Sequence, residues 1–281
     1  MENIENYNEM LNAEADHWDE FERDFIENKK IIPWWLDLQR ASKVAPNTNE
    51  GLDPYKENLV RGKYKQKILE NCNSGDKVLD IGCGSGWLSL ELARKGCQVT
   101  AIDISPYRIA LAKAYLAKIQ KTETLLGSIN YICGDIKEVE LASPLDVIVA
   151  WDSLHHFPSL DELFERLKQF LKPEGKIVCY DHLGSKFIEN LGKIRRYFVE
   201  EKVSAFEDVS QDEIHEFINK HFQIEEKRYR ISAPFRLLAF ALFRYDFFNF
   251  LIRPAVAMDE IICNKLKFLG KEFIFIKAKN K

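Results

Sequence analysis

The stretch from Val78 to Gly86, which reads V-L-D-I-G-C-G-S-G, constrains the fold of this chain more than any other. It begins as a short apolar run, which is typical of a buried parallel strand, and then continues into glycines at every second position. The chain restarts as a helix at Trp87, and Gly96 marks the expected end of that helix. Glycine lets the backbone approach a ligand closely, and a helix N-terminus offers unpaired N–H groups. A strand that turns through glycines into a helix therefore predicts a ligand-binding loop.

The spacing of these glycines narrows the choice of ligand. A dinucleotide-binding turn has the pattern G-x-G-x-x-G, and its third glycine would fall at Trp87, which disfavours a nicotinamide-dependent dehydrogenase. The pattern D-x-G-x-G-x-G resembles instead motif I of the class I S-adenosylmethionine-dependent methyltransferases. The resemblance implies that the turn wraps the methionine part of the cofactor. The cofactor-binding residues implied here are Asp80, Gly82, Cys83, Gly84 and Gly86.

Further segments follow in the order expected for this family, and the resemblance covers about residues 60 to 183. Residues 97–103 form a strand that ends in an acid, where a carboxylate can accept hydrogen bonds from ribose hydroxyls. A third strand, 129–133, precedes a segment that resembles the family's adenine-binding corner, and a fourth, 146–150, follows. These segments add Asp103, Ile104, Asp135, Ile136, Trp151 and Asp152 to the implied cofactor site.

A basic residue before motif I can pair with the carboxylate of the cofactor in similar enzymes, and Arg61 stands at that place. The alternative is an ordinary solvated charge. The resemblance implies S-adenosylmethionine as the cofactor and S-adenosylhomocysteine as the product.

Alternating strands and helices predict an α/β fold with a doubly wound sheet. The later strands are expected at 176–180, 222–230 and 272–277. By the resemblance, the sheet is seven-stranded, mostly parallel and Rossmann-like, with the order 3-2-1-4-5-7-6 and the last strand antiparallel. Three parts are expected. They are a helical cap with its linker (1–54), the cofactor-binding core (55–183), and the C-terminal half of the core with a helical insertion at about 231–271 (184–281).

The N-terminal part predicts a cap made of helices. Residues 1–13 are polar and are expected to fray, and a helix is expected from about Glu14 to Arg40 with a break at Pro33. Trp18 and the phenylalanines that follow it recur at helical spacing. They dock this arm onto the core, cover the cofactor and substrate cleft, or do both.

Residues 234–270 are rich in phenylalanine and leucine, yet arginines and an aspartate interrupt them. No run approaches the roughly 20 apolar residues that a membrane span needs. Three alternatives remain for this segment. It forms a lid over an apolar substrate pocket, it packs in the core or in a homodimer, or its 234–258 portion lies on a membrane surface.

Composition bounds the class of protein. The chain has 281 residues, a net charge of −4 and 30% charged residues, so we expect a globular protein that does not bind nucleic acid. Its six cysteines include no C-x-x-C pair, which predicts reduced thiols. The polar, acidic N-terminus shows no secretory signal, so a cytoplasmic location is expected.

The expected catalytic residues are the histidines that follow strands four and five, His155, His156 and His182, with His156 slightly favoured. His155 has an alternative role as a hydrogen-bond partner of the turn backbone. Asp152 with His155 and His156 could suggest a metal site, but adjacent histidines rarely converge on one ion, so no metal is predicted.

The predicted function is methyl transfer to a small-molecule or lipid-like acceptor of apolar or amphipathic character, at the carboxyl ends of strands four and five. Such a transfer is an in-line displacement, and whether it needs a base depends on an acceptor atom that the sequence leaves open. The alternative is a non-catalytic protein that binds S-adenosylmethionine and serves as a regulatory or structural subunit.

Overall fold

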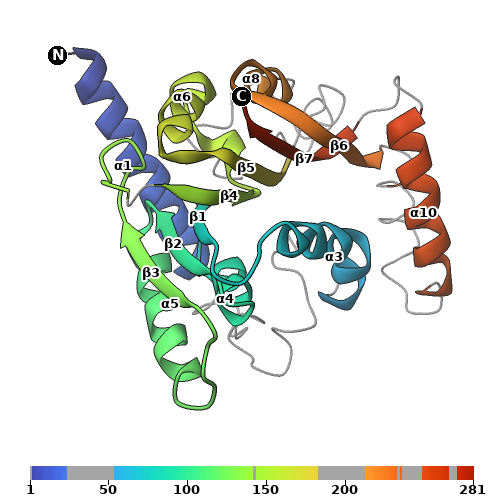
Figure 1. Ribbon diagram of the computed structural model, residues 1–281, viewed down its shortest axis with the longest axis horizontal. Helices are drawn as coiled ribbons and strands as arrows, with labels where there is room; N and C mark the ends of the chain where they lie inside the picture. Colours follow the sequence, from blue (N-terminus) through green and yellow to red (C-terminus); the bar gives the residue numbers. More distant parts are fainter. Residues whose placement is uncertain are drawn as a thin grey trace, which may run out of the picture.

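The computed structural model describes residues 2–23, 54–141, 144–182, 213–232, 235, 249–265 and 271–281. Within them, seven strands form one sheet in the order β3-β2-β1-β4-β5-β7-β6 (Figure 1). The strands are β1 (Lys77–Ile81), β2 (Gln98–Asp103), β3 (Ser128–Cys133), β4 (Leu145–Trp151), β5 (Leu171–His182), β6 (Phe222–Ser232) and β7 (Lys271–Asn280). The first five pair in parallel, and β7 lies antiparallel between β5 and β6. The predicted fold and strand order are confirmed.

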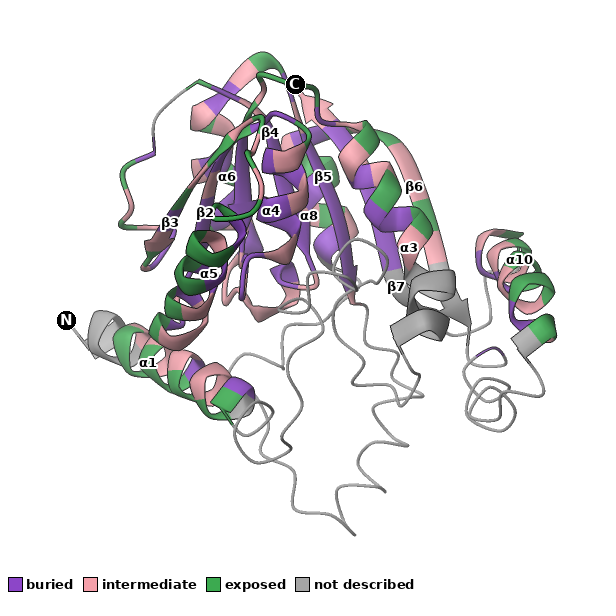
Figure 2. Ribbon diagram, turned by 90° about the horizontal axis from the view of Figure 1, so that it is seen from below, coloured by how far each residue is buried: buried purple, intermediate pink, exposed green. Residues whose placement is uncertain are grey.

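Helices cover both faces of the sheet (Figures 1 and 2). One face packs against α3 (Pro54–Glu70), α4 (Trp87–Arg94) and α5 (Pro106–Ile119), and the other against α6 (Leu160–Phe170) and α8 (Glu213–His221). Side chains alternate between the two faces along each strand, so Val78 belongs to the first core cluster and Leu79 to the second. Because β1 is buried on both faces, its sequence is a continuous apolar run rather than an alternating one.

Local signals account for the helix starts. The side chain of Ser105 accepts a hydrogen bond from the backbone N–H of Arg108 at 3.1 Å, and Pro106 occupies the first helical position. Strand β5 begins earlier than the expected 176, but Leu145 pairs with Leu171 and Val147 pairs with Lys176. Residues 172–175 are therefore bulged out of this pairing.

The N-terminal helix differs from the expectation. Helix α1 (Glu2–Arg23) includes residues that were expected to fray, so that expectation is wrong. The helix is ordered because one stripe of it, at three- and four-residue spacing, lines a cavity of the core: Tyr7, Leu11, Glu14, Trp18 and Glu22. The segment predicted to continue this helix to Arg40, and most of the linker, lie outside the described residues.

Helix α10 (Asn249–Lys265) lies beside β6 and α3, and Lys63 of α3 pairs with its Glu260 at 2.8 Å (Figure 1). Phe250, Met258 and Ile261 of α10 are exposed. The roles considered for this segment, as lid, dimer contact or membrane contact, stay predictions. In the described ranges, no helix combines the length and the apolar character that a membrane crossing requires.

Candidate cofactor and acceptor site

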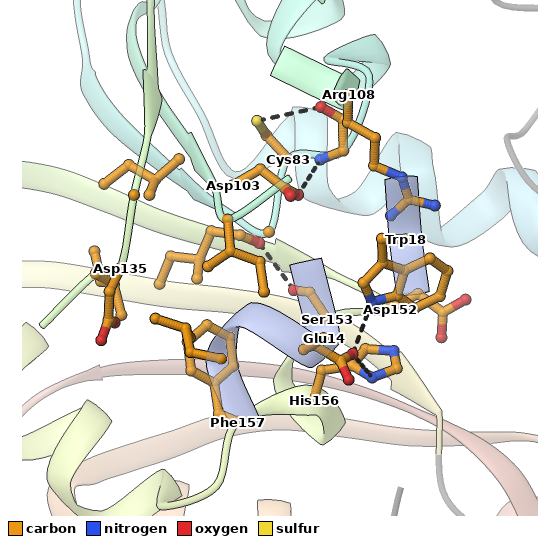
Figure 3. A pocket seen from close by; sticks show the side chains of 18 of the residues that line it. Glu14, Trp18, Cys83, Asp103, Arg108, Asp135, Asp152, Ser153, His156 and Phe157 are labelled. Carbon is orange, nitrogen blue, oxygen red and sulfur yellow. Dashed lines mark hydrogen bonds and ion pairs between the residues drawn. The ribbon is translucent and has the colours of Figure 1, made fainter. Parts of the chain in front are cut away.

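A cavity of about 1140 Å³, its open mouth included, lies at the carboxyl ends of the central strands (Figure 3). Helix α1 forms one wall, and the strand ends with their loops form the other. This is the position at which ligands bind in open parallel sheets. The cavity brings together most of the predicted site residues, namely Gly82, Cys83, Gly84, Asp103, Ile104, Asp135, Ile136, Trp151, Asp152 and His156.

The glycine turn forms the floor of the cavity. Gly82 and Gly84 have φ of +64° and +53°, a left-handed conformation that strains other residues. A Cβ added at Gly82 would lie 2.5 Å from the Cβ of Ser153, so the packing itself excludes a side chain there. A Cβ added at Gly84 would meet only the Arg108 guanidinium, at 4.0 Å. The space above Gly84 is therefore open to a ligand, as a cofactor-wrapping turn requires.

Asp103, at the end of β2, connects the glycine turn to α5. Its Oδ2 accepts a hydrogen bond from the N–H of Gly84 at 2.7 Å, and its Oδ1 accepts one from the N–H of Ser105 at 2.9 Å. An ionised carboxylate has about four lone-pair sites, so two remain after these bonds. The carboxylate lines the cavity, and its remaining lone pairs suit the hydroxyls of a ribose.

Asp135, after β3, accepts hydrogen bonds from two parts of the chain. Its Oδ1 accepts the backbone N–H of Lys137 at 2.9 Å, and its Oδ2 accepts the hydroxyl of Tyr7 at 2.7 Å. Burial, followed by the Asp135 carboxylate, raises the pKa of Tyr7, so its hydroxyl keeps its proton and donates. Helix α1 is thus fastened to the corner that the sequence marks as adenine-binding.

Two of the predicted cofactor residues, Asp80 and Gly86, do not line the cavity. Asp80 is 1% exposed and accepts a hydrogen bond from the Ser89 hydroxyl at 2.6 Å, which fastens the start of α4 behind the turn. Gly86 precedes α4, and its carbonyl accepts the hydroxyl of Tyr131 at 3.2 Å. Both residues support the turn from behind. The side chain of Arg61 lies outside the described part of the structure.

His156 is the predicted catalytic histidine that lines the cavity (Figure 3). Its Nδ1 lies 3.2 Å from Oε1 of Glu14, and its ring meets that of Trp18 edge-on at 5.0 Å. Burial lowers the pKa of His156 and the neighbouring His155 lowers it further, while Glu14 acts in the opposite direction. The net lowering favours the neutral imidazole, which can accept a proton.

His155 and His182 are not among the residues that line the cavity. The Nδ1 of His155 lies 2.6 Å from Oδ1 of Asp181, a carboxylate with no solvent exposure. Asp181 also accepts the backbone N–H groups of Ser153, Leu154 and His182, at 2.7 to 3.0 Å. This carboxylate holds the loop after β4 in place, so the contacts of His155 fit a supporting role.

Asp152, His155 and Asp181 each offer a ligand atom within 4.8 Å of the others. The contacts of Asp181 with His155 and with backbone N–H groups already engage both of its oxygens. Asp152 has φ of +53°, the one non-glycine residue with positive φ in the described ranges, and such strain is concentrated at functional sites. That no metal is bound here stays a prediction.

Comparison with known proteins identifies the family. A family profile described as a methyltransferase domain matches residues 50–222, which is more than half of the chain. This chain belongs to the methyltransferase domain family. Its membership confirms the predicted family and S-adenosylmethionine as the cofactor, and the open glycine turn beside Asp103 fits that cofactor.

Two curated relatives of this methyltransferase-domain chain are named as O-methyltransferases. The mitochondrial ubiquinone biosynthesis O-methyltransferase of Schizosaccharomyces pombe is 31% identical over 165 residues, 59% of this chain and 53% of that protein. The magnesium-protoporphyrin O-methyltransferase of Rhodobacter capsulatus is 33% identical over 123 residues, 44% and 50% of the two chains. The chain thus spans about half the length of the curated relatives it matches.

A solved structure shows the same fold over almost the whole chain. Geranyl diphosphate C-methyltransferase from Streptomyces coelicolor A3(2) aligns with a TM-score of 0.59 and covers 97% of this chain and 98% of its own. The sequence identity is 14%, so this likeness concerns the fold alone.

Several cavity residues of the methyltransferase domain were missed by sequence reasoning. Four of them, Tyr7, Leu11, Glu14 and Glu22, come from α1, and Arg108 comes from α5. The guanidinium of Arg108 lies 4.1 Å from the centre of the Trp18 ring and 3.4 Å from Glu22. Burial raises the pKa of Glu22, and Arg108 opposes that rise. The regular spacing from Tyr7 to Glu22 is the signal that could have found the α1 residues.

Proposed function

We propose that this protein transfers the methyl group of S-adenosylmethionine to a hydroxyl oxygen of a small, apolar acceptor. The observation that carries the proposal is the imidazole of His156, 15% exposed, which faces the cavity that the glycine turn also lines. A hydroxyl must lose its proton during transfer, and a neutral histidine can take it. The names of the two O-methyltransferase relatives support an oxygen acceptor.

The cofactor half of the cavity is assigned as follows. Asp103 accepts the ribose hydroxyls, and Asp135 accepts the adenine amine beside Ile136. The turn from Gly82 to Gly84 holds the methionine part, and Arg61 is the proposed partner of its carboxylate. The bound cofactor supplies an activated methyl group and leaves as S-adenosylhomocysteine.

The cavity also has apolar walls beside its polar groups. Leu11 and Trp18 of α1 and Phe157 and Pro158 of the loop after β4 contribute them. Such walls exclude water and hold an apolar body, which leaves the hydroxyl to contact the imidazole. His156 then takes the hydroxyl proton, while His155 keeps the loop in position. Both remain proposals, as does any catalytic part for His182.

The test uses the full chain with S-adenosylmethionine and three probes of equal chain length: hexylcatechol, hexylamine and hexanethiol. Mass spectrometry identifies the methylated product, and release of S-adenosylhomocysteine gives the rate. Methylation of hexylcatechol, lost in His156→Asn while calorimetry shows cofactor binding retained, supports the proposal. Preference for the amine or the thiol overturns the oxygen assignment. Tight cofactor binding without turnover on any probe favours the non-catalytic alternative.

A further inference from the structure

We propose that Glu14 of α1 is a positioning residue for His156: it accepts the Nδ1 proton of the imidazole and so leaves Nε2 as the proton acceptor. This inference rests on the proposed function for its catalytic meaning, although the pairing itself can be tested without turnover. Nothing in the sequence pattern marked Glu14 for such a role, since it is a polar residue in a helix of an N-terminal cap.

The geometry of Glu14 supports a specific role. Its side chain is 1% exposed, and an uncompensated buried carboxylate would be costly. Its Oε1 accepts a hydrogen bond from the indole N–H of Trp18 at 2.7 Å and lies 3.2 Å from Nδ1 of His156. Both partners lie in the cavity wall, so the carboxylate is oriented from its own helix and directed at the imidazole (Figure 3).

The chemical consequence follows from the two nitrogens of histidine. In a neutral imidazole one nitrogen carries the proton and the other accepts one, and a carboxylate beside Nδ1 selects the Nδ1–H form. Nε2 then accepts the proton of the acceptor hydroxyl. As this O–H bond breaks, His156 becomes a cation, and the adjacent negative charge of Glu14 stabilises it. The same logic operates wherever a third group orients a catalytic base.

The other charged groups around His156 are engaged elsewhere or act against protonation. The ring of His155 lies 3.9 Å away, centre to centre, and lowers the pKa of His156. Asp181 favours the protonated form, but its oxygens are bound to His155 and to backbone N–H groups. Glu14 is the carboxylate in contact with His156 in the described part of the chain.

The position of Glu14 on α1 adds a second consequence. The helix also contacts the core through Tyr7 at Asp135 and through Glu22 at Arg108. The base is therefore completed only when α1 lies over the cavity, which is also when the acceptor is shielded from water.

The first test measures the histidine rings directly. Long-range proton–nitrogen correlation spectra of the full chain, with His156→Asn for assignment, report which ring nitrogen carries the proton and how the ring titrates. We expect Nδ1–H in the wild type. Glu14→Gln keeps an oxygen acceptor but loses the charge, so the tautomer persists while the pKa of His156 falls. An Nε2–H tautomer in the wild type, or an unchanged titration in Glu14→Gln, overturns the inference whatever the activity of the protein.

The second test uses the pH profile of hexylcatechol methylation. In Glu14→Gln, kcat falls by about tenfold or more, and the acid limb of the profile moves to lower pH. KM and calorimetric cofactor affinity stay within about twofold of wild type, and Glu14→Asp recovers part of the rate. The matched control is Glu9→Gln, an exposed glutamate of the same helix. A fall in rate with an unmoved acid limb would mean a structural role and contradict the inference, whereas an inactive wild type contradicts the proposed function alone.

Discussion

The hydroxyl of Tyr7 donates a 2.7 Å hydrogen bond to Oδ2 of Asp135 across 128 residues of sequence. The ammonium of Lys137 lies 4.4 Å from the centre of the Tyr7 ring, on the same side of the site. These contacts join the first part of α1 to the corner where we place the adenine amine. Docking of the helix and binding of the cofactor therefore share a carboxylate, and we expect the two to be coupled.

Replacing Tyr7 with phenylalanine tests this coupling. The variant loses a hydrogen bond worth about 1 kcal/mol, which corresponds to about fivefold in an equilibrium constant. We expect S-adenosylmethionine affinity, measured by calorimetry, to fall by about that factor because α1 docks less firmly. Glu9→Gln should bind as the wild type does. Tighter binding by Tyr7→Phe would show that the tyrosine competes with the cofactor for Asp135, contrary to the coupling argued here.

Asp103 should contribute more to cofactor affinity than any other acid of the site. Asp103→Ala removes the acceptor for the ribose hydroxyls and for the Gly84 N–H, so we expect a loss of about 2–3 kcal/mol, or about 30- to 150-fold in affinity. Asp103→Asn keeps one side-chain oxygen, so its cofactor affinity should lie between that of Asp103→Ala and that of the wild type. Unchanged affinity in the alanine variant would refute the placement of the ribose at the end of β2.

Alanine at the two cavity glycines should have different effects, mainly on stability at Gly82 and mainly on cofactor affinity at Gly84. Both pay the cost of a left-handed φ, about 1–2 kcal/mol. In Gly82→Ala the new methyl group also collides with Ser153, so thermal unfolding should occur at a clearly lower temperature. In Gly84→Ala the methyl group enters open space, so the fold survives with a modest loss while cofactor affinity falls at least tenfold. Equal losses of stability in the two variants would contradict this distinction.

Asp80 should make the stability of the ligand-free protein depend on pH. Burial raises the pKa of this carboxyl from its ordinary value to about 7. Between these two values the folded state retains a proton that the unfolded state has released, so stability falls as pH rises from about 4 to about 7. The side chain of Asp80→Asn does not titrate. As pH rises through that window, the free energy of unfolding of the variant should therefore increase relative to that of the wild type. Urea unfolding at a series of pH values measures the free energy of unfolding of both proteins. If the two free energies changed with pH in the same way, the proposed titration would be ruled out.

The strand, turn and helix around Gly82 could be predicted from the sequence because their signals are local. Glycines at alternate positions, a Ser-Pro helix start and apolar strands each act within a few residues. Asp103 and Asp135 could also be placed, because the carboxyl ends of parallel strands meet at one edge of the sheet. The strand order came from the family resemblance and not from any local pattern.

The remaining features depend on contacts that the linear sequence does not show. Glu14 and Glu22 are charged, so the sequence does not show that their side of α1 faces the core. Their partners, His156 and Arg108, lie far along the chain. The choice between adjacent histidines depends on a short 3₁₀ turn, Leu154–His156, which directs one ring into the cavity and the other toward Asp181.

The stripe from Tyr7 to Glu22 has a consequence for how acceptor specificity can change. One wall of the cavity is a single continuous helix, and the glycine turn with its two acids is built from separate strands. Exchanging only Leu11 and Trp18 on that helix would reshape the acceptor space, while Tyr7 and Glu14 keep their contacts with Asp135 and His156. These two positions can therefore diverge in evolution while the contacts to Asp135 and His156 stay fixed, and substitutions there offer a direct route to new acceptors on the same scaffold.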